Sequence, residues 1–288
     1  MEYFGKTFKE IRENRNFSLS DVCEEHISTA QFSRFEKGKT DISISRFYKS
    51  LKRLGVSLEE FEYILSGYQQ SERNQLLEKL SKAYVNNDTD KIKSLLDKQE
   101  KRKNSSDEHD KWNYYMLKSI WGLMTEQEYL TTNEIKEMAG YLFSIEDWGY
   151  YQLVFYTNTI TSYEFKTVMQ FSKELVMRTA YYRKIPKNRQ LVIQALLNTI
   201  YICAFKQKLK EGLYYQQIVQ ELLDETDLYY KTVLLVMSGL LDCIDSKLDK
   251  GKDKVDRAIQ IFRDLDSDTL AKSYQQDYQK ILALIEKS

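Results

Sequence analysis

The stretch Ile27-Ser28-Thr29-Ala30-Gln31-Phe32-Ser33-Arg34-Phe35-Glu36-Lys37-Gly38 predicts a short helix with two distinct faces. Ser28 can cap the first turn with its hydroxyl, and Gly38 can adopt the left-handed conformation that ends a helix. At helical spacing, one face is apolar and carries Ile27, Phe32 and Phe35. The other face carries small residues and one long cation: Thr29, Ala30, Ser33 and Arg34. Small side chains permit close approach to base edges and a guanidinium can fork onto a guanine, so this face is typical of a DNA recognition helix.

Four more short helical patterns surround this helix. Their apolar positions are Phe4, Phe8 and Ile11, then Leu19, Val22 and Cys23, then Phe47, Leu51 and Leu54, and finally Phe61, Ile64 and Leu65. Residues that begin and end helices stand between them: Ser18, Ser43, the capping-box pair Ser57 and Glu60, and the stops Gly55 and Gly67. Five short helices predict a small all-helical domain over residues 1–66.

The run Ser28–Gly38, which ends in Ser-Arg-Phe-Glu-Lys-Gly, resembles the phage-repressor type of helix-turn-helix found in Cro and C1-like domains. The resemblance implies base reading by four residues of the third helix: Thr29, Ala30, Ser33 and Arg34. It places the candidate phosphate contacts near helix ends, at Arg15, Lys37, Lys39 and Ser43. Glu36 matches a buried or capping glutamate of the family, so we expect it to be structural. Leu19 stands where such domains often carry a glutamine that braces the DNA contact, which puts that contact in doubt.

The charge of the first domain is only mildly basic. Residues 1–56 contain eleven basic and eight acidic residues, a net charge of +3, and the whole chain has a formal net charge of zero. Non-specific attraction to DNA should therefore be modest and strongly dependent on salt. We expect binding to a double-stranded DNA operator to rest on a local patch and on a homodimer.

The rest of the chain is predicted to be helical as well. One proline and ten glycines in 288 residues leave too few turn formers for a sheet protein. The expected helix pairs are 73–86 with 89–102, 107–123 with 132–144, 146–160 with 163–184, 187–208 with 213–225, and 228–245 with 252–265. Pairs that recur roughly every 40 residues indicate an α-solenoid of tetratricopeptide-like architecture over residues 71–288.

Local signals divide these pairs. The expected polar turns are Asn86-Asn87-Asp88, Asn104-Ser105-Ser106-Asp107, Lys184-Ile185-Pro186 and Asp249-Lys250-Gly251. Capping-box patterns are expected at Thr131 with Glu134 and at Thr161 with Glu164, and Pro186 fits a first helical turn. A last helix over 268–286 is expected to cap the stack with an apolar seam of Leu270, Tyr274, Tyr278, Ile281 and Ile285.

Composition argues against catalysis and against secretion. The three cysteines, Cys23, Cys203 and Cys243, are widely separated in apolar patterns, which favours buried thiols in a reducing compartment over disulfides or a metal site. His26 and His109 have no ligand partners by spacing. The sequence shows no glycine-rich phosphate loop, no nucleophile with a histidine base and no run of 18 apolar residues. We therefore expect a cytoplasmic protein that is not an enzyme, needs no cofactor and does not enter the membrane.

The order of the two domains and the length of the chain resemble the Rgg/GadR/MutR family of transcriptional regulators from Gram-positive bacteria. The resemblance covers the whole chain. It is most specific at Ile42-Ser43-Ile44-Ser45-Arg46-Phe47, which follows the recognition helix, and at Glu146-Asp147-Trp148-Gly149-Tyr150-Tyr151. It implies a homodimer whose helical domain binds a short hydrophobic signalling peptide, a quorum-sensing pheromone.

An extended peptide has unpaired amides and carbonyls, so its binder needs amide side chains between apolar walls. Asn158 and Asn198 are the best candidates, because each interrupts an otherwise apolar helix in which asparagine is a poor fit. Gln152 and Gln194 lie on compatible faces, and the expected walls are Tyr151, Phe155, Tyr201 and Ile202. The alternative, that each asparagine bonds a neighbouring helix or lies on the surface, stays open.

The sequence therefore predicts an all-α, DNA-binding transcriptional regulator controlled by a peptide on the concave face of its helical repeats. The competing hypothesis is a helical-repeat adaptor that binds a partner protein and whose N-terminal domain does not read DNA.

Overall fold

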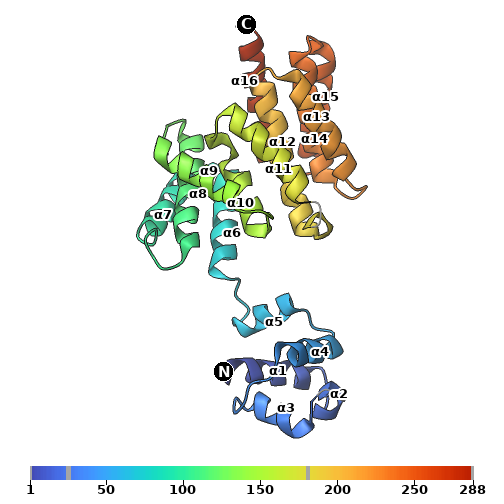
Figure 1. Ribbon diagram of the computed structural model, residues 1–288. Helices are drawn as coiled ribbons and strands as arrows, with labels where there is room; N and C mark the ends of the chain where they lie inside the picture. Colours follow the sequence, from blue (N-terminus) through green and yellow to red (C-terminus); the bar gives the residue numbers. More distant parts are fainter. Residues whose placement is uncertain (1, 24–26, 180–181, 287–288) are drawn as a thin grey trace. The chain divides into compact units, whose positions relative to one another are not determined.

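The computed structural model describes residues 2–23, 27–179 and 182–286. These residues form α-helices, short 3₁₀ turns and loops, with no β-strand among them, which confirms the predicted all-α class. The expectation for His26 lies outside the described residues. Backbone contacts divide the chain into two compact units, Met1–Lys79 and Leu80–Ser288 (Figure 1). The division falls inside a helix, later than the linker expected between residues 66 and 71.

The N-terminal unit contains the five short helices that the sequence predicts. They are α1 (Glu2–Asn14), α2 (Leu19–Cys23), α3 (Thr29–Glu36), α4 (Ile44–Leu54) and α5 (Leu58–Leu65). Local capping fixes their ends: the Ser28 hydroxyl accepts from the amide of Gln31 at 3.2 Å, and Gly38 ends α3 with a φ of 67°. Ser57 accepts from the amide of Glu60 at 3.0 Å, but the Glu60 carboxylate bonds Arg15, so the capping box is only half formed.

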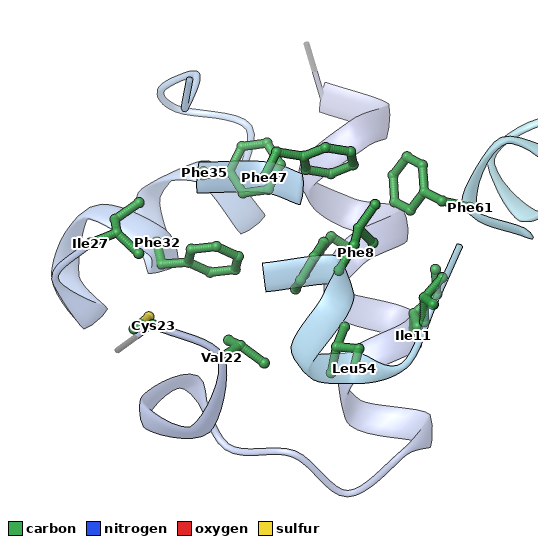
Figure 2. Packing of buried hydrophobic residues seen from close by; sticks show 12 residues of the cluster. Phe8, Ile11, Val22, Cys23, Ile27, Phe32, Phe35, Phe47, Leu54 and Phe61 are labelled. Atoms are coloured by element: carbon green, nitrogen blue, oxygen red, sulfur yellow. The ribbon is translucent and has the colours of Figure 1, made fainter. Parts of the chain in front are cut away.

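Phenylalanine rings hold this unit together (Figure 2). The fully buried Phe8 of α1 meets Phe32 of α3 edge-on at 5.0 Å, and Phe47 of α4 meets Phe61 of α5 at 4.9 Å. Edge-to-face contacts of this kind add stability beyond the area that the rings bury. Helix α1 also approaches α3 so closely that a Cβ on Gly5 would overlap the carbonyl oxygen of Phe35.

The C-terminal unit begins within α6 and consists of helix pairs and a last helix (Figure 1). Its elements are α6 (Glu72–Val85), α7 (Thr89–Glu100), α8 (Glu108–Thr125), α9 (Thr132–Ser144), α10 (Tyr150–Thr159), α11 (Phe165–Arg178), α12 (Pro186–Phe205), α13 (Leu209–Leu222), α14 (Leu228–Ile244), α15 (Leu248–Asp264) and α16 (Asp268–Ile285). Two 3₁₀ turns, Ile160–Ser162 and Tyr182–Lys184, lie beside α11. Every predicted pair is present.

Two rows of helices give this unit its curvature. Consecutive even-numbered helices pack on each other, α8 on α10, α10 on α12, α12 on α14, and α14 on α16. Within the described ranges, consecutive odd-numbered helices from α7 to α15 make no comparably close approach. Closely spaced helices lie on the inside of a curved stack, so α8, α10, α12, α14 and α16 form the concave side. We call them the inner row.

Several local predictions are confirmed. Thr131 and Glu134 form a reciprocal capping box at the start of α9, and Pro186 occupies the first turn of α12. All three cysteines are buried and free, and burial raises the pKa of the Cys203 thiol to about 12. The last helix, α16, packs on α15 and α14 as expected of a cap, and it also reaches α12.

Among the described helices, none is both long and apolar enough to cross a membrane.

Other boundary predictions are wrong, for identifiable reasons. Residues 146–149 are not helical, because the chain turns there to insert the fully buried Trp148, whose indole donates to the carbonyl of Leu142 at 3.1 Å. Thr161 lies in a 3₁₀ turn and Glu164 becomes the residue before α11, so no capping box forms. Helix α11 ends at Arg178, earlier than predicted.

The stretch Asp249-Lys250-Gly251 is not a turn either, since it lies within the first turn of α15. Gly251 is buried where α15 crosses α14. A Cβ there would lie 2.6 Å from the carbonyl oxygen of Gly239 and would collide with the sulfur of Cys243. The glycine therefore permits a close helix crossing, a purpose that turn propensity does not reveal.

Gly251→Ala should lower the free energy of unfolding by about 1–3 kcal/mol, because overpacking at the crossing outweighs the better helix propensity of alanine. Gly140→Ala is the matched control: Gly140 also lies inside a helix, and a Cβ there would meet nothing within 4 Å. The control should be neutral or stabilising by up to about 1 kcal/mol in urea unfolding. Equal effects of the two substitutions would contradict the close crossing.

Candidate functional site

The outer face of α3 is open to solvent. Thr29, Ala30 and Arg34 are exposed and Ser33 is half-buried. In the described part of the chain, the Arg34 guanidinium makes no hydrogen bond or ion pair. The sequence therefore places these four residues on one accessible face, with the long cation free to bind.

A buried ion pair fixes the opposite side of α3. The guanidinium of Arg12 donates to both carboxylate oxygens of Glu36, at 2.7 and 2.9 Å, and to the carbonyl of Phe17 at 2.7 Å. Both side chains are buried, and donating hydrogen bonds to the Glu36 carboxylate raises the pKa of Arg12. The expectation that Glu36 is structural is confirmed. A bidentate pair of this kind fixes orientation as well as distance, so it positions α3 on α1.

The four candidate phosphate contacts differ in their availability. Lys37 and Lys39 are exposed beyond the end of α3, and Ser43 caps α4, where its hydroxyl accepts from the amide of Arg46 at 3.5 Å. Arg15 is already engaged inside the unit, because it donates to the carbonyl of Leu54 at 2.6 Å and to Glu60 at 2.5 Å. We correct its assignment to a structural link from the turn after α1 to the end of α4 and to α5.

Leu19 does not face outward as a bracing glutamine would. It begins α2 and packs partly buried against the phenylalanine core. The sequence could not show that Arg15 is engaged inside the unit while Lys37 and Lys39 are exposed, because all three are basic residues near helix ends.

The two candidate asparagines lie on neighbouring helices of the inner row. The amide of Asn198 on α12 donates to the carbonyl of Thr157 on α10 at 3.4 Å and accepts from Gln194 at 3.3 Å. Asn158 on α10 donates to the carbonyl of Val154, one turn earlier, at 2.8 Å. Each side chain is half-buried and keeps unused hydrogen-bonding capacity. Asn198 thus bonds a neighbouring helix, as the alternative interpretation supposed.

The first turns of α12 are accessible, but from Val192 to Phe205 most residues are buried. The accessible residues of that part follow helical spacing along one stripe: Gln194, Asn198, Tyr201, Ile202 and Phe205. The hydroxyl of Tyr201 donates to Asp277 of α16 at 3.1 Å. This stripe is the accessible surface that α12 offers on the concave side.

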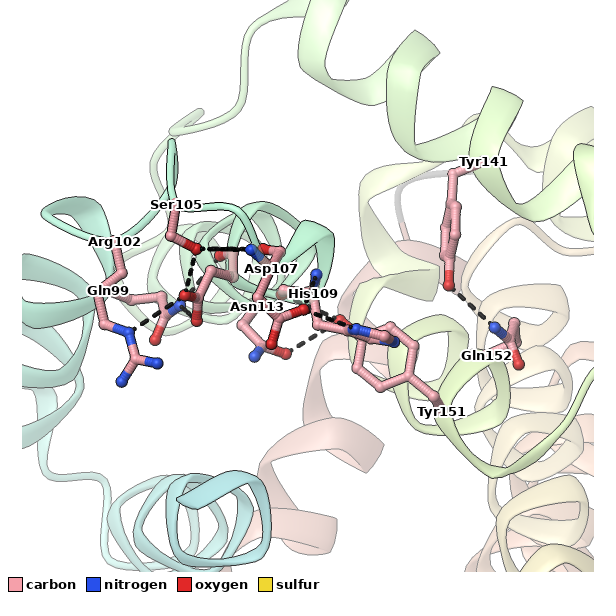
Figure 3. A network of polar contacts seen from close by, with 10 residues as sticks. Gln99, Arg102, Ser105, Asp107, His109, Asn113, Tyr141, Tyr151 and Gln152 are labelled. Atoms are coloured by element: carbon pink, nitrogen blue, oxygen red, sulfur yellow. Dashed lines mark hydrogen bonds and ion pairs between the residues drawn. The ribbon is translucent and has the colours of Figure 1, made fainter. Parts of the chain in front are cut away.

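Two of the predicted peptide walls are interior residues. Phe155 is fully buried beneath Trp112 and Tyr141, and Tyr151 is 8% exposed. Figure 3 shows that the Tyr151 hydroxyl points into a polar network, where it donates to Asn113 at 3.0 Å. We correct both assignments, because in this arrangement neither ring can line a ligand. Most residues of α10 are buried, and the sequence could not distinguish the residues of an inner wall from those of the core.

Gln152, another predicted peptide contact, is already hydrogen-bonded within the fold. Its amide donates to the hydroxyl of Tyr141 at 2.9 Å and accepts from the backbone of Gly149 at 3.2 Å, so it fixes the start of α10 (Figure 3). The carbonyl of His109 accepts from the Tyr151 hydroxyl at 3.3 Å, and the Nδ1 atom of His109 lies 2.9 Å from the Asp107 carboxylate.

Sequence reasoning predicted Tyr201 as a peptide wall but missed its partner Asp277. Asp277 stands one turn after Tyr274 in the apolar seam of the last helix, and an acid in such a seam was a usable signal. No group of three or more histidine, cysteine or acidic side chains in the described residues is arranged to hold a metal ion.

A helix-turn-helix unit joined to an array of helical repeats defines the class of this protein. A model of the C-terminal domain of the HTH-type transcriptional regulator Rgg matches residues 93–276. The chain belongs to the Rgg family.

Solved structures match almost the entire chain. The SHP pheromone receptor Rgg2 of Streptococcus dysgalactiae is 29% identical, with a TM-score of 0.80 over 97% of this chain and 99% of that one. A protein of Listeria monocytogenes EGD-e is 21% identical, with a TM-score of 0.82 and 99% coverage of both chains. PrgX in complex with iCF10 is 16% identical, with a TM-score of 0.72 over 99% of this chain and 98% of that one. The last two likenesses show the fold.

Glu36→Ala should destabilise the N-terminal unit by about 3–5 kcal/mol, because it leaves the Arg12 guanidinium buried without its partner. All three tryptophans, Trp112, Trp121 and Trp148, lie in the C-terminal unit. In urea unfolding of Glu36→Ala, circular dichroism should therefore show part of the helical signal lost at a lower urea concentration than in the unaltered protein. The urea midpoint of the tryptophan fluorescence should not change. Lys9→Ala, which breaks the exposed pair with Glu13, should change stability by less than about 1 kcal/mol. An unchanged dichroism midpoint for Glu36→Ala would refute this role.

Proposed function

We propose that this chain is a sequence-specific DNA-binding transcriptional regulator controlled by a short hydrophobic peptide. The observation that carries the proposal is the unpaired Arg34 on the outer face of a recognition-type helix whose inner side is fixed by the Arg12–Glu36 pair. Membership in a family of HTH-type transcriptional regulators supports it.

DNA contacts divide into two kinds. Thr29, Ala30, Ser33 and Arg34 would reach base edges in the major groove, where a guanidinium pairs with the O6 and N7 atoms of guanine. Lys37, Lys39 and the capped start of α4 at Ser43 would hold phosphates and so set the register on the duplex. With no excess charge on the whole chain, two such units in a homodimer would supply the affinity.

The peptide site would lie on the concave side. The stripe on α12 that carries Gln194, Asn198, Tyr201 and Ile202, together with Asn158 on α10, combines amides for a peptide backbone with apolar surface for its side chains. The matched Rgg2 is a pheromone receptor and PrgX was solved with iCF10, which supports a peptide as the ligand. The regulator would act in the cytoplasm, where DNA and imported peptide meet.

Control of DNA binding by the peptide requires that the peptide bind two arrangements of the repeats with different affinities. A peptide that binds one arrangement of the repeats more tightly than another shifts the population toward it, and the DNA-binding units follow. The competing adaptor hypothesis predicts no specific DNA complex. A mobility shift with the promoter beside the chain's own coding region separates the two.

Arg34→Ala should weaken binding to a specific operator by about 1–3 kcal/mol and flatten its sequence preference, because a bidentate base contact is lost. Lys39→Ala is the matched control at a phosphate position. It should weaken all sequences alike and reduce the slope of log affinity against log salt by about one. Unchanged base preference in Arg34→Ala, measured by fluorescence anisotropy with operator variants, would show that α3 does not read bases.

Asn198→Ala should weaken peptide binding by about 1–3 kcal/mol while DNA binding and dimerisation persist, because a buried peptide group loses its partner. Fluorescence polarisation with labelled apolar octapeptides measures the loss, and thermal melting measures stability alongside. Asn158→Ala should have a smaller effect, since Asn158 bonds its own helix. A fall in melting temperature without a change in peptide affinity would make Asn198 a structural bridge between α10 and α12.

A further inference from the structure

Four tyrosines and one aspartate from four helices converge in the C-terminal unit. We call them the tyrosine–aspartate cluster: Tyr84 of α6, Tyr201 of α12, Tyr229 of α14, and Tyr274 and Asp277 of α16. Tyr201 donates to the Oδ1 atom of Asp277 at 3.1 Å, and Tyr274 lies close enough to Tyr229 to interact with it electrostatically. Tyr84 is close enough to interact electrostatically with Asp277 and Tyr229. These contacts join residues that are nearly two hundred positions apart in the sequence.

The cluster remains open to solvent. Tyr84 is 49% exposed and Tyr229 is 41% exposed, while Tyr201, Tyr274 and Asp277 are half-buried. Two of its members also rest on apolar support, since Tyr274 stacks on Phe262 at 5.4 Å and Tyr201 contacts Phe205 at 6.4 Å. A ligand can therefore reach ring faces and a carboxylate that the fold holds in place.

Asp277 is electrostatically unlike the other perturbed carboxylates of the described residues. Burial raises the pKa of Asp277, whereas partners lower the pKa of carboxylates such as Asp227, which is paired with Arg189. Lys280 acts on Asp277 electrostatically, but its ammonium lies 3.7 Å from Glu126 at the end of α8. Asp277 makes no ion pair with any described residue. Its charge is thus partly desolvated and only weakly compensated, a state that an incoming cation would relieve.

The tyrosines suit a cation as well. Burial raises the pKa of Tyr84, Tyr201 and Tyr274, so these phenols stay neutral and present uncharged ring faces. Aromatic faces attract cations, most strongly where water is partly excluded. Tyr201 already donates to Oδ1 of Asp277, so Oδ2 is the less occupied carboxylate oxygen. A compact ammonium group needs only one such acceptor and can contact several ring faces at once, so it fits this arrangement.

We propose that the tyrosine–aspartate cluster binds an ammonium group of the peptide ligand, held between the tyrosine rings and the open oxygen of Asp277. The inference rests on the proposed peptide-sensing function and adds a charge requirement to it. The hydrophobic peptide carries one ammonium that the concave side reads, either its α-amino terminus or a lysine side chain.

The first experiment uses the full-length protein and pooled octapeptides of leucine, isoleucine, valine and phenylalanine with one lysine, an amidated C-terminus and a fluorophore there. Four pools are compared by fluorescence polarisation: both amines present, N-terminus acetylated, lysine replaced by norleucine, and both amines removed. The pool without amines should bind about tenfold more weakly than the best amine pool. The two single-amine pools show which source supplies the ammonium.

Asp277→Asn keeps an acceptor for Tyr201 and removes the charge. It should bring all four pools within about twofold of each other, mainly by weakening the amine pools. Asp253→Asn is the matched control, because it removes an equal charge from an exposed pair with Arg257 on α15. In Asp253→Asn, the ratio of affinities between the amine pools and the neutral pool should equal that of the unaltered protein. Equal binding of the neutral and amine pools by the unaltered protein, or equal weakening of all pools in Asp277→Asn, would overturn the proposal.

A second measurement is independent of any peptide. Millimolar n-hexylammonium chloride should raise the melting temperature of the unaltered protein and of Asp253→Asn, but not of Asp277→Asn, and n-hexanol should raise none of them. If hexylammonium protects through Asp277 while no peptide pool binds, the peptide-sensing function is wrong and the ammonium site stands. If the pools bind without charge preference and hexylammonium does not protect, the ammonium site is wrong and the sensor stands. Failure of both responses overturns both.

Discussion

The packing of α12 is the constraint on which the C-terminal unit depends. This helix contacts α10, α11, α13, α14 and α16, and from Val192 to Phe205 its side chains are buried on every side but one. A helix that is apolar almost all round is stable only when other helices surround it. The repeats on either side of α12 are therefore parts of one core, and the stripe of Gln194, Asn198 and Tyr201 is its main opening to solvent. A ligand on that stripe contacts the helix that holds the array together.

The N-terminal unit is small and is held together in a different way. A domain of this size buries little surface, so it relies on specific contacts more than on volume. Edge-to-face phenylalanine pairs supply part of that specificity, and the Arg12–Glu36 pair supplies the rest by fixing the angle of α3. Buried ion pairs are poor sources of net stability but good determinants of orientation. Orientation is what a helix that reads base edges requires.

The sequence predicted most of the fold, because helix starts and ends are encoded locally. Ser28 caps α3 and Thr131 caps α9 through bonds to residues three positions away, and such bonds follow from spacing alone. The wrong boundary predictions concern residues whose conformation depends on contacts with other helices. Gly251 serves a helix crossing, and the turn before α10 exists to bury Trp148.

The candidate sites show the same limit. The outer face of α3 could be predicted because one helix carries it. Arg15 and Phe155 could not be placed, because their partners Glu60, Leu54, Trp112 and Tyr141 come from other helices. The tyrosine–aspartate cluster spans α6 to α16, so local pattern shows at most that Asp277 stands in an apolar seam and not which tyrosines surround it.

The Glu126–Lys280 pair joins the end of α8 to α16, and both side chains are largely exposed. An exposed pair of this kind contributes at most about 1 kcal/mol, comparable to thermal energy. The link between the end of α8 and α16 is therefore weak, whereas the surroundings of α12 are densely packed. Salt screens an exposed pair, so high ionic strength should loosen this link before it affects the core around α12.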